Sequence, residues 1–221
     1  MTIKRLFDIA VSLVVLICLW PLFVIGAIAV KLSSPGPALY KQMRVGQHGI
    51  LFTCYKLRTM FINSEKQGSV TASTDSRITS VGQFLRKYKL DEFPQVWNVL
   101  VGKMSFVGPR PDVPGYADKL VGENRKILQM RPGITGLATI FFRYEEEILS
   151  QVKDPRGFND SIIWPMKIKM NLEYLKNKSI ITDMGIIVIT VCPGINNWLH
   201  LVPSSPRTPE ELMKAFQFVK G

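Results

Sequence analysis

The feature that most constrains this chain is an apolar segment near its N-terminus. Residues 6–30 read LFDIAVSLVVLICLWPLFVIGAIAV, and Asp8 is the only charged side chain among them. About 20 apolar residues are enough for a helix to cross the hydrocarbon core of a bilayer. Pro21 lies in the middle of the segment, where proline removes a backbone hydrogen bond and kinks or breaks a helix. The sequence therefore predicts a bent membrane helix at the start of the fold.

Basic residues flank this segment at both ends, with Lys4 and Arg5 before it and Lys31 after it. A straight span would put one basic flank outside, whereas a hairpin-like helix that enters and leaves on one face keeps both on the cytoplasmic side. A cleaved signal peptide is the alternative, and Ala27-Ile28-Ala29 resembles a cleavage site. The apolar run is long for a signal peptide, however, and an internal proline is unfavourable there. We therefore predict a membrane anchor over residues 1–32.

The charge balance and the cysteines limit what the protein can bind. Lys and Arg outnumber Asp and Glu by 28 to 17, which gives a formal net charge of +11. Such an excess favours an anionic partner: nucleic acid, an anionic membrane surface or a phosphorylated small molecule. No nucleic-acid-binding module is recognisable. The three cysteines are odd in number and form no CxxC pair, which indicates reduced thiols rather than a disulfide or a zinc site.

The chain after a break at residues 33–37 (SSPGP) has the mixed pattern of an α+β domain. We predict a cytoplasmic domain over 33–202 and a tail of unknown role over 203–221. Within the domain the sequence predicts a strand near 50–55, a polar surface loop over 62–77, a rigid loop over 107–115, and helices over 78–101 (interrupted at Pro94), 116–130 and 161–178. The apolar run 180–191 is too short to span a bilayer, so it is either a core helix or an interfacial segment, with Trp198 as a membrane-surface anchor.

Two adjacent carboxylates, Asp91 and Glu92, stand shortly before Pro94, a residue that can open a helix. Free backbone N–H groups and the helix dipole favour negative charge at a helix start. Asp91 could therefore stay ionised and act as a nucleophile or as a metal ligand. From this run alone the simpler interpretation, helix-start acids without a chemical role, is favoured.

Several cations are placed where the backbone is stiff or regular. Arg110 stands between Pro109 and Pro111, and Arg131 precedes a Pro-Gly turn. A guanidinium held in this way suits bidentate recognition of a phosphate, although a turn with a solvated arginine is the alternative. Lys56 and Arg58 alternate along a predicted strand and share one face. A bilayer segment, one acidic pair and stiffly presented cations together suit phosphoryl transfer on a membrane-bound phosphate.

In these motifs the chain resembles the bacterial polyprenyl-phosphate sugar-1-phosphate transferases, the small monotopic phosphoglycosyl transferases that start exopolysaccharide, O-antigen or glycoprotein glycan synthesis. The similarity runs over nearly the whole chain. It is carried by the Pro-containing first helix and by residues 34–37 (SPGP), 42–52 (QxRxGxxGxxF), 56–60 (KLRTM), 90–95 (LDEFPQ), 105–111 (SFVGPRP) and 131–136 (RPGITG).

The resemblance implies a fold: a Pro-kinked re-entrant membrane helix and a small, mostly helical cytoplasmic domain with a short sheet and interfacial amphipathic helices. It also implies a reaction on the cytoplasmic side of the inner membrane. Asp91 would attack a nucleotide-diphosphate sugar, and polyprenyl phosphate would then take the sugar-phosphate. Glu92, with Asp91, would bind Mg²⁺. The cations expected to bind phosphates are Lys56, Arg86, Arg110 and Arg131.

The chain departs from the family pattern after residue 136. Many members continue with a WAQVNGR-like stretch, where this chain has residues 137–143 (LATIFFR) followed by three glutamates, and Lys103 stands where an acid is frequent. These differences bear on which sugar is transferred rather than on the type of reaction. A non-catalytic, membrane-anchored basic binding or scaffold protein is the alternative function, since it would use the same anchor and charge. Such a protein has no use for Asp91 and Glu92 beside a stiffly held Arg110.

Overall fold

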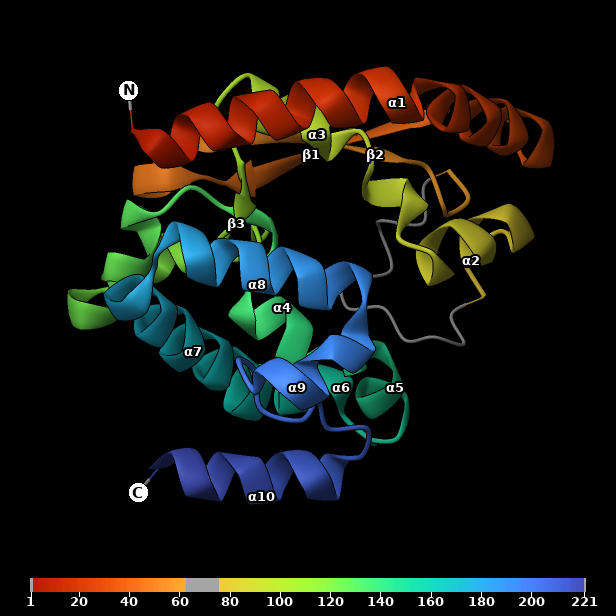
Figure 1. The fold of residues 1–221 in the computed structure, drawn as a ribbon. Coiled ribbons are helices and arrows are strands. Elements are labelled where there is room, and N and C mark those ends of the chain that lie inside the picture. Colours follow the sequence, from red (N-terminus) through yellow and green to blue (C-terminus); the bar gives the residue numbers. More distant parts are fainter. Residues whose placement is uncertain (1, 63–75, 221) are drawn as a thin grey trace. The chain divides into compact units, whose positions relative to one another are not determined.

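The computed structural model of the chain describes residues 2–62 and 76–220, which divide into two compact units. The first unit contains the N-terminal part of the chain up to residue 106, together with residues 111–119. The second contains residues 107–110 and the chain from residue 120 onward. Most of the predicted surface loop over 62–77 lies outside the described residues. The mixed architecture of helices and small sheets that the sequence predicts is confirmed (Figure 1).

The first unit is built from one long helix, a β-hairpin and two short helices. Its elements are α1 (Ile3–Ser33), β1 (Leu39–Val45), β2 (Leu51–Leu57), α2 (Ser80–Lys87), α3 (Gln95–Leu100) and the start of β3 (Ser105–Val107). Strands β1 and β2 pair antiparallel, with Tyr40 opposite Lys56. Helix α1 packs along α3 and contacts β2 (Figure 1). The hairpin and both short helices are therefore arranged around the apolar helix.

Helix α1 accounts for the whole apolar segment and extends beyond it. Its 31 residues correspond to about 46 Å at the usual rise of 1.5 Å per residue, more than the roughly 30 Å of a bilayer core. Large apolar side chains on it, such as Ile17, Trp20 and Ile25, are mostly exposed. By length and composition α1 could cross a membrane, and among residues 2–62 and 76–220 it is the one helix that is long and apolar enough.

Polar bonds hold the N-terminal turns of α1 to the unit. Arg5 donates from its guanidinium to the carbonyls of Val99 (2.5 Å) and Leu100 (2.6 Å), at the end of α3. The carboxylate of Asp8 accepts from the hydroxyl of Ser105 and from the backbone N–H that follows it, both at 3.2 Å. Asp8 is buried, so the single charge in the apolar segment faces the protein.

The other end of α1 is held by a buried arginine. Arg58, directly after β2, donates to the carbonyl of Ser34 at 2.8 Å and also to the carbonyl of Pro35. Gly36 adopts a φ of +116°, and a side chain there would press on the Arg58 guanidinium at 2.6 Å. The predicted break after the helix is thus a fixed turn, which only glycine fits easily.

The second unit consists mainly of helices. Its elements are the end of β3, β4 (Gly133–Thr135), α4 (Leu137–Phe141), α5 (Glu145–Ser150), α6 (Pro155–Phe158), α7 (Trp164–Asn177), α8 (Ile180–Val191), α9 (Asn196–Leu199) and α10 (Pro209–Lys220). Helix α4 packs against both α7 and α8. The helix predicted over 161–178 corresponds to α7, and the apolar run 180–191 forms α8.

Helix α8 buries one face and exposes the other. Ile186 and Ile189 are buried, and buried Asp183 accepts a hydrogen bond from the Tyr174 hydroxyl at 2.5 Å. Ile181 on the opposite face is 83% exposed, so α8 is a core helix with an apolar outer face. The predicted anchor next to it, Trp198, has a side chain outside the described part of the structure.

The helix predicted over 116–130 forms two short 3₁₀ segments instead, Ala117–Lys119 and Gly122–Gln129. Val121 between them is extended, and Gly122 has a φ of +57°, so a continuous α-helix cannot pass through this point.

The C-terminal tail also has structure. Arg207 stacks on the ring of Tyr144 at 4.4 Å and donates to its hydroxyl, which ties the tail to the segment before α5.

Candidate active site

Asp91 and Glu92 lie in a single 3₁₀ turn between α2 and α3. The chain leaves α2 through Lys89, which adopts a left-handed conformation with a φ of 56°, and this residue turns the chain into the acidic pair. Pro94 is the N-cap of α3, as the sequence predicts. Both residues are only 7% exposed, far less than ordinary helix-start acids. Two adjacent buried acids indicate a site rather than a solvated helix end.

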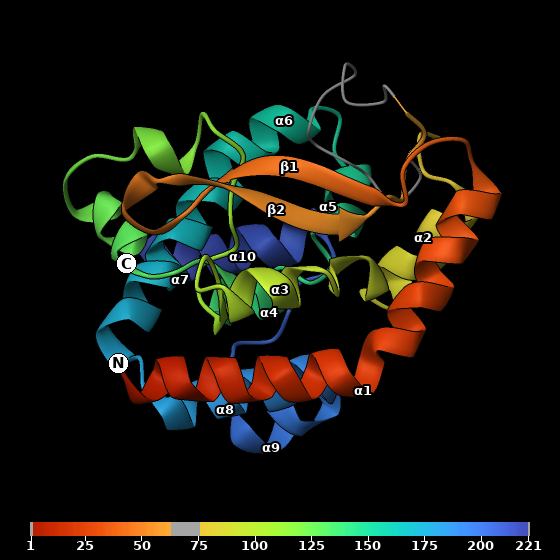
Figure 2. The ribbon, with the colours of Figure 1, turned by 90° about the horizontal axis from the view of Figure 1, so that it is seen from above.

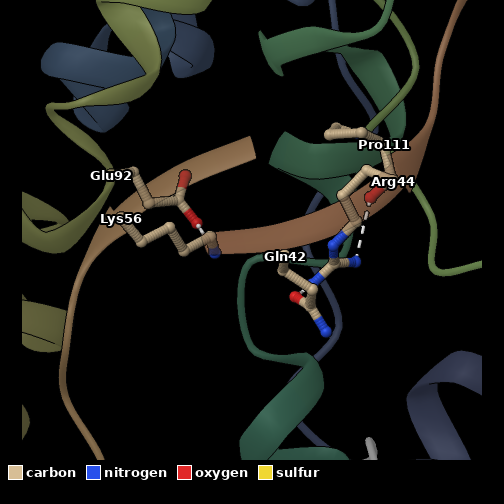
Figure 3. A network of polar contacts seen from close by, with 5 residues as sticks. All are labelled: Gln42, Arg44, Lys56, Glu92 and Pro111. Carbon is tan, nitrogen blue, oxygen red and sulfur yellow. Dashed lines mark hydrogen bonds and ion pairs between the residues drawn. The ribbon is translucent and has the colours of Figure 1, made fainter. Parts of the chain in front are cut away.

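Lys56 of β2 forms an ion pair with Glu92, with its Nζ 3.0 Å from Oε1 (Figure 3). Both side chains are largely shielded from solvent, so salt screens this pair less than a surface pair. The ammonium compensates the charge of one carboxylate and fixes its orientation. The structure therefore brings together one predicted phosphate-binding cation and the predicted acidic pair, although 36 positions separate them in the sequence.

Arg44 is a residue of this region for which the sequence analysis predicts no role. It donates to the carbonyl of Pro111 at 3.0 Å and also to the side chain of Gln42 (Figure 3). Val45, beside it, donates to the carbonyl of Asp112 at 2.9 Å. Strand β1 therefore fixes the chain that leaves Arg110. The only sequence signal for this contact was that Gln42 and Arg44 belong to the motif over residues 42–52, one of those that carry the family resemblance.

The loop that carries Arg110 is fixed on its other side within the second unit. Gly133 donates to the carbonyl of Pro109 at 2.7 Å, and Gly108 donates to the carbonyl of Thr135 at 3.0 Å. A side chain at Gly108 would collide with the backbone of Arg131. The loops that carry the two arginines are thus paired by hydrogen bonds and by close approach at glycine. Arg110 is exposed and Arg131 is half-buried.

The other two cations of the first unit have different surroundings. Arg86 is half-buried in the last turn of α2, one short turn before the acidic pair. Arg58, predicted to share a strand face with Lys56, follows the end of β2 and binds the backbone after α1. Arg58 therefore has a structural role, whereas Lys56 is paired with Glu92 and Arg86 precedes Asp91 by five positions.

The donor groups of the site fit magnesium better than a transition metal. In the described residues no three His, Cys, Asp or Glu side chains come together, so the protein offers no complete metal cage there. Mg²⁺ is usually held by one or two carboxylates, with water and substrate phosphates completing its shell. The buried carboxylates of Asp91 and Glu92, which are adjacent in sequence, match that requirement.

Comparison with known proteins places the chain in a family. The model of the bacterial sugar transferase family matches residues 1–197, so the chain belongs to this family. It is 37% identical over 193 residues to the UDP-glucose:undecaprenyl-phosphate glucose-1-phosphate transferase of Xanthomonas campestris pv. campestris, covering 85% of this chain and 37% of the relative. An enzyme of the same name from Klebsiella pneumoniae is 36% identical over 206 residues, covering 89% of this chain and 41% of the relative.

A third relative is named for a different sugar. The UDP-N-acetylgalactosamine-undecaprenyl-phosphate N-acetylgalactosaminephosphotransferase of Aeromonas hydrophila is 36% identical over 193 residues, covering 86% of this chain and 43% of the relative. The chain thus spans about two fifths of the length of these three relatives. All three names give undecaprenyl phosphate as the acceptor, whereas the sugar is glucose in two of them and N-acetylgalactosamine in the third.

Proposed function

We propose that this protein transfers a sugar-1-phosphate from a nucleotide-diphosphate sugar, a UDP-sugar, to undecaprenyl phosphate at the cytoplasmic face of the inner membrane. The product would be the first lipid-linked sugar of an exopolysaccharide, an O-antigen or a protein-linked glycan. Family membership and the names of the relatives support the reaction. The observation that carries the proposal is the buried Asp91–Glu92 pair with Lys56 bound to its second carboxylate.

The proposed reaction has two displacements, both at the phosphorus that bears the sugar. A carboxylate oxygen of Asp91 first attacks this phosphorus, and the bond to the departing nucleoside monophosphate breaks. An oxygen of the polyprenyl phosphate then attacks the same phosphorus, and the bond to Asp91 breaks. The second step yields a polyprenyl-diphosphate sugar and regenerates the carboxylate. Burial supports this role, because it strips Asp91 of most of the water that would otherwise weaken it as a nucleophile.

The surrounding side chains would orient and neutralise the phosphates. Glu92, assisted by Asp91, would hold Mg²⁺, which when bound would offset the charge that develops on the diphosphate. Lys56 keeps the Glu92 carboxylate in one orientation. Arg86, Arg110 and Arg131 would bind phosphate oxygens. For Arg110 the support is its exposed position on a loop whose flanking carbonyls are hydrogen-bonded.

We also propose that α1 is a re-entrant anchor and that α8 lies at the membrane surface. Pro21 is inside α1, and Figure 2 shows that the helix axis changes direction along its length. The exposed apolar face of α8 would suit the interface. Single cysteines at Thr2 and Ser33, in otherwise cysteine-free protein, can test the topology by labelling intact cells with an impermeant thiol reagent. A re-entrant helix leaves both sites unlabelled, and labelling of only one of them would show a straight span.

The reaction is tested with detergent-solubilised protein, undecaprenyl phosphate, Mg²⁺ and a panel of UDP-sugars, read by release of nucleoside monophosphate. We expect release with at least one sugar and loss of release in Asp91→Asn. A non-catalytic anchored binding protein would release none with any sugar. The panel also identifies the sugar, which the different names of the relatives leave open.

A further inference from the structure

Asn98 is a buried residue of α3 that the proposed reaction does not use. Only 2% of it is exposed, and its side-chain amide makes two bonds to the backbone of β2. The amide nitrogen donates to the carbonyl of Thr53 at 2.8 Å, and the amide oxygen accepts from the N–H of Tyr55 at 3.3 Å. A strand in a two-stranded sheet has an edge without a strand partner. The Asn98 amide satisfies two backbone groups of β2 as a neighbouring strand would.

These two bonds close a ring with the ion pair of the candidate active site. Lys56 follows Tyr55 directly on β2, and Glu92 precedes Asn98 by less than two helical turns. The intervening chain is helical, with Val96 donating to the carbonyl of Phe93 at 3.0 Å. A stiff strand and a stiff helical segment are therefore joined at two places, by the Asn98 amide and by the Lys56–Glu92 pair.

Two connections are needed to fix the relative orientation of two rigid segments. The Lys56 side chain is long and flexible, so the ion pair alone leaves α3 and the acidic turn free to shift along β2. The Asn98 amide is short, buried and bonded at both of its polar ends. It therefore adds a fixed contact between α3 and β2, beside the contacts of α3 with α1.

We propose that Asn98 is a positioning residue for this reaction: its amide bridge to β2 places the acidic turn so that Lys56 holds Glu92 in its working orientation. The inference rests on the proposed function, because the orientation matters only if the pair takes part in transfer. Displacement of a reacting group by about 1 Å can lower a rate by about 100-fold. We expect Asn98→Ala to lower turnover by about 10- to 100-fold, and Asn98→Ser, which keeps one possible bond, to lower it less.

Asn196 provides a matched control in the second unit. Its amide donates to the carbonyl of Val202 at 2.7 Å and accepts from the N–H of the same residue at 3.1 Å. Asn196→Ala therefore removes the same kind of two-bond bridge within the unit that does not contain Asp91 and Glu92. We expect it to lower the melting temperature as Asn98→Ala does, and to change turnover by less than about twofold.

A double-mutant cycle separates positioning from general destabilisation. If Asn98 acts through Lys56, then Asn98→Ala should lower turnover by less than about threefold in a Lys56→Ala background. Full additivity of the two substitutions would overturn the inference, as would wild-type turnover in Asn98→Ala.

A second measurement is independent of turnover. Acylation of the Lys56 amine by a water-soluble ester, followed by peptide mass spectrometry, should be severalfold faster in Asn98→Ala or Asn98→Ser than in wild type and Asn196→Ala. An unchanged rate would overturn the positioning role even if the enzyme is active. If acylation is faster in the Asn98 variants but the wild-type protein releases no nucleoside monophosphate, the positioning contact stands and the proposed function fails.

Discussion

Replacement of Gly82 by alanine tests how tightly α2, and with it Arg86, is packed. An ideal Cβ at this position would lie 2.7 Å from the carbonyl carbon of Thr59 and 2.8 Å from its Cα, and closer still to its oxygen. Ordinary contacts begin at 3.4 Å, so the helix start must move by at least 0.7 Å, the difference between 3.4 and 2.7 Å. The atoms in the way are backbone, so no side-chain rotation can relieve the contact.

Two opposing effects decide the sign of this substitution. Alanine is favoured over glycine inside a helix by about 1 kcal/mol at most. Overpacking costs about 1–3 kcal/mol, and the required shift also weakens two bonds of Thr79. Its hydroxyl caps α2 by accepting from the N–H of Gly82 at 2.9 Å, and its N–H donates to Thr59 at 2.9 Å. Each bond contributes about 1 kcal/mol. We therefore expect a net loss of about 1–3 kcal/mol.

The melting temperature in detergent measures this loss. For a chain of this size about 1 kcal/mol corresponds to about 2–4 °C, so Gly82→Ala should melt at least about 2–4 °C below wild type. Gly194→Ala adds the same methyl group where no atom lies within 4 Å, and it should change the melting temperature little. If Gly82→Ala melts at or above the wild-type temperature, the packing of α2 against Thr59 is not as described.

Three further predictions concern the chain around the site. Lys89→Gly should stabilise the protein by about 1 kcal/mol, because Lys89 has a φ of 56° and this left-handed conformation is strained for residues other than glycine. A lower melting temperature of Lys89→Gly would contradict this strain. Arg110→Lys keeps the charge but loses the planar fork, so turnover should fall at least about tenfold, whereas Arg125→Lys should leave it unchanged. Chelation should abolish turnover and added Mg²⁺ should restore it; full activity in excess chelator would exclude the metal role of Glu92.

The sequence predicted those parts of the fold that depend on local patterns. The apolar run 180–191, bounded by Ser179 and Pro193, became α8, and Pro94 began α3. These positions are set by a cap, a proline and hydrophobic length, which can be read from neighbouring residues. The segment 116–130 has a helical composition but forms 3₁₀ turns, because Gly122 takes a positive φ that composition does not specify.

The contacts of the candidate site were less predictable, because they join distant parts of the chain. The Lys56–Glu92 pair and the bonds of Asn98 to β2 each span more than 35 positions, and no local pattern encodes them. Arg58 shows the same limit: its alternation with Lys56 suggested one basic face, yet its guanidinium binds the turn after α1. The sequence motifs thus named candidate residues for the site, and the structure was needed to tell which of them meet.

The most direct test of the proposed mechanism is the first displacement without a lipid acceptor. Protein incubated with nucleotide-sugar and Mg²⁺ alone should release up to one nucleoside monophosphate per enzyme and gain a sugar-phosphate mass on the peptide that contains Asp91. Asp91→Asn should show neither, because a neutral amide is a far poorer nucleophile. If the enzyme turns over with undecaprenyl phosphate but releases no nucleoside monophosphate and forms no adduct without it, the lipid phosphate attacks directly. Asp91 is then not the nucleophile.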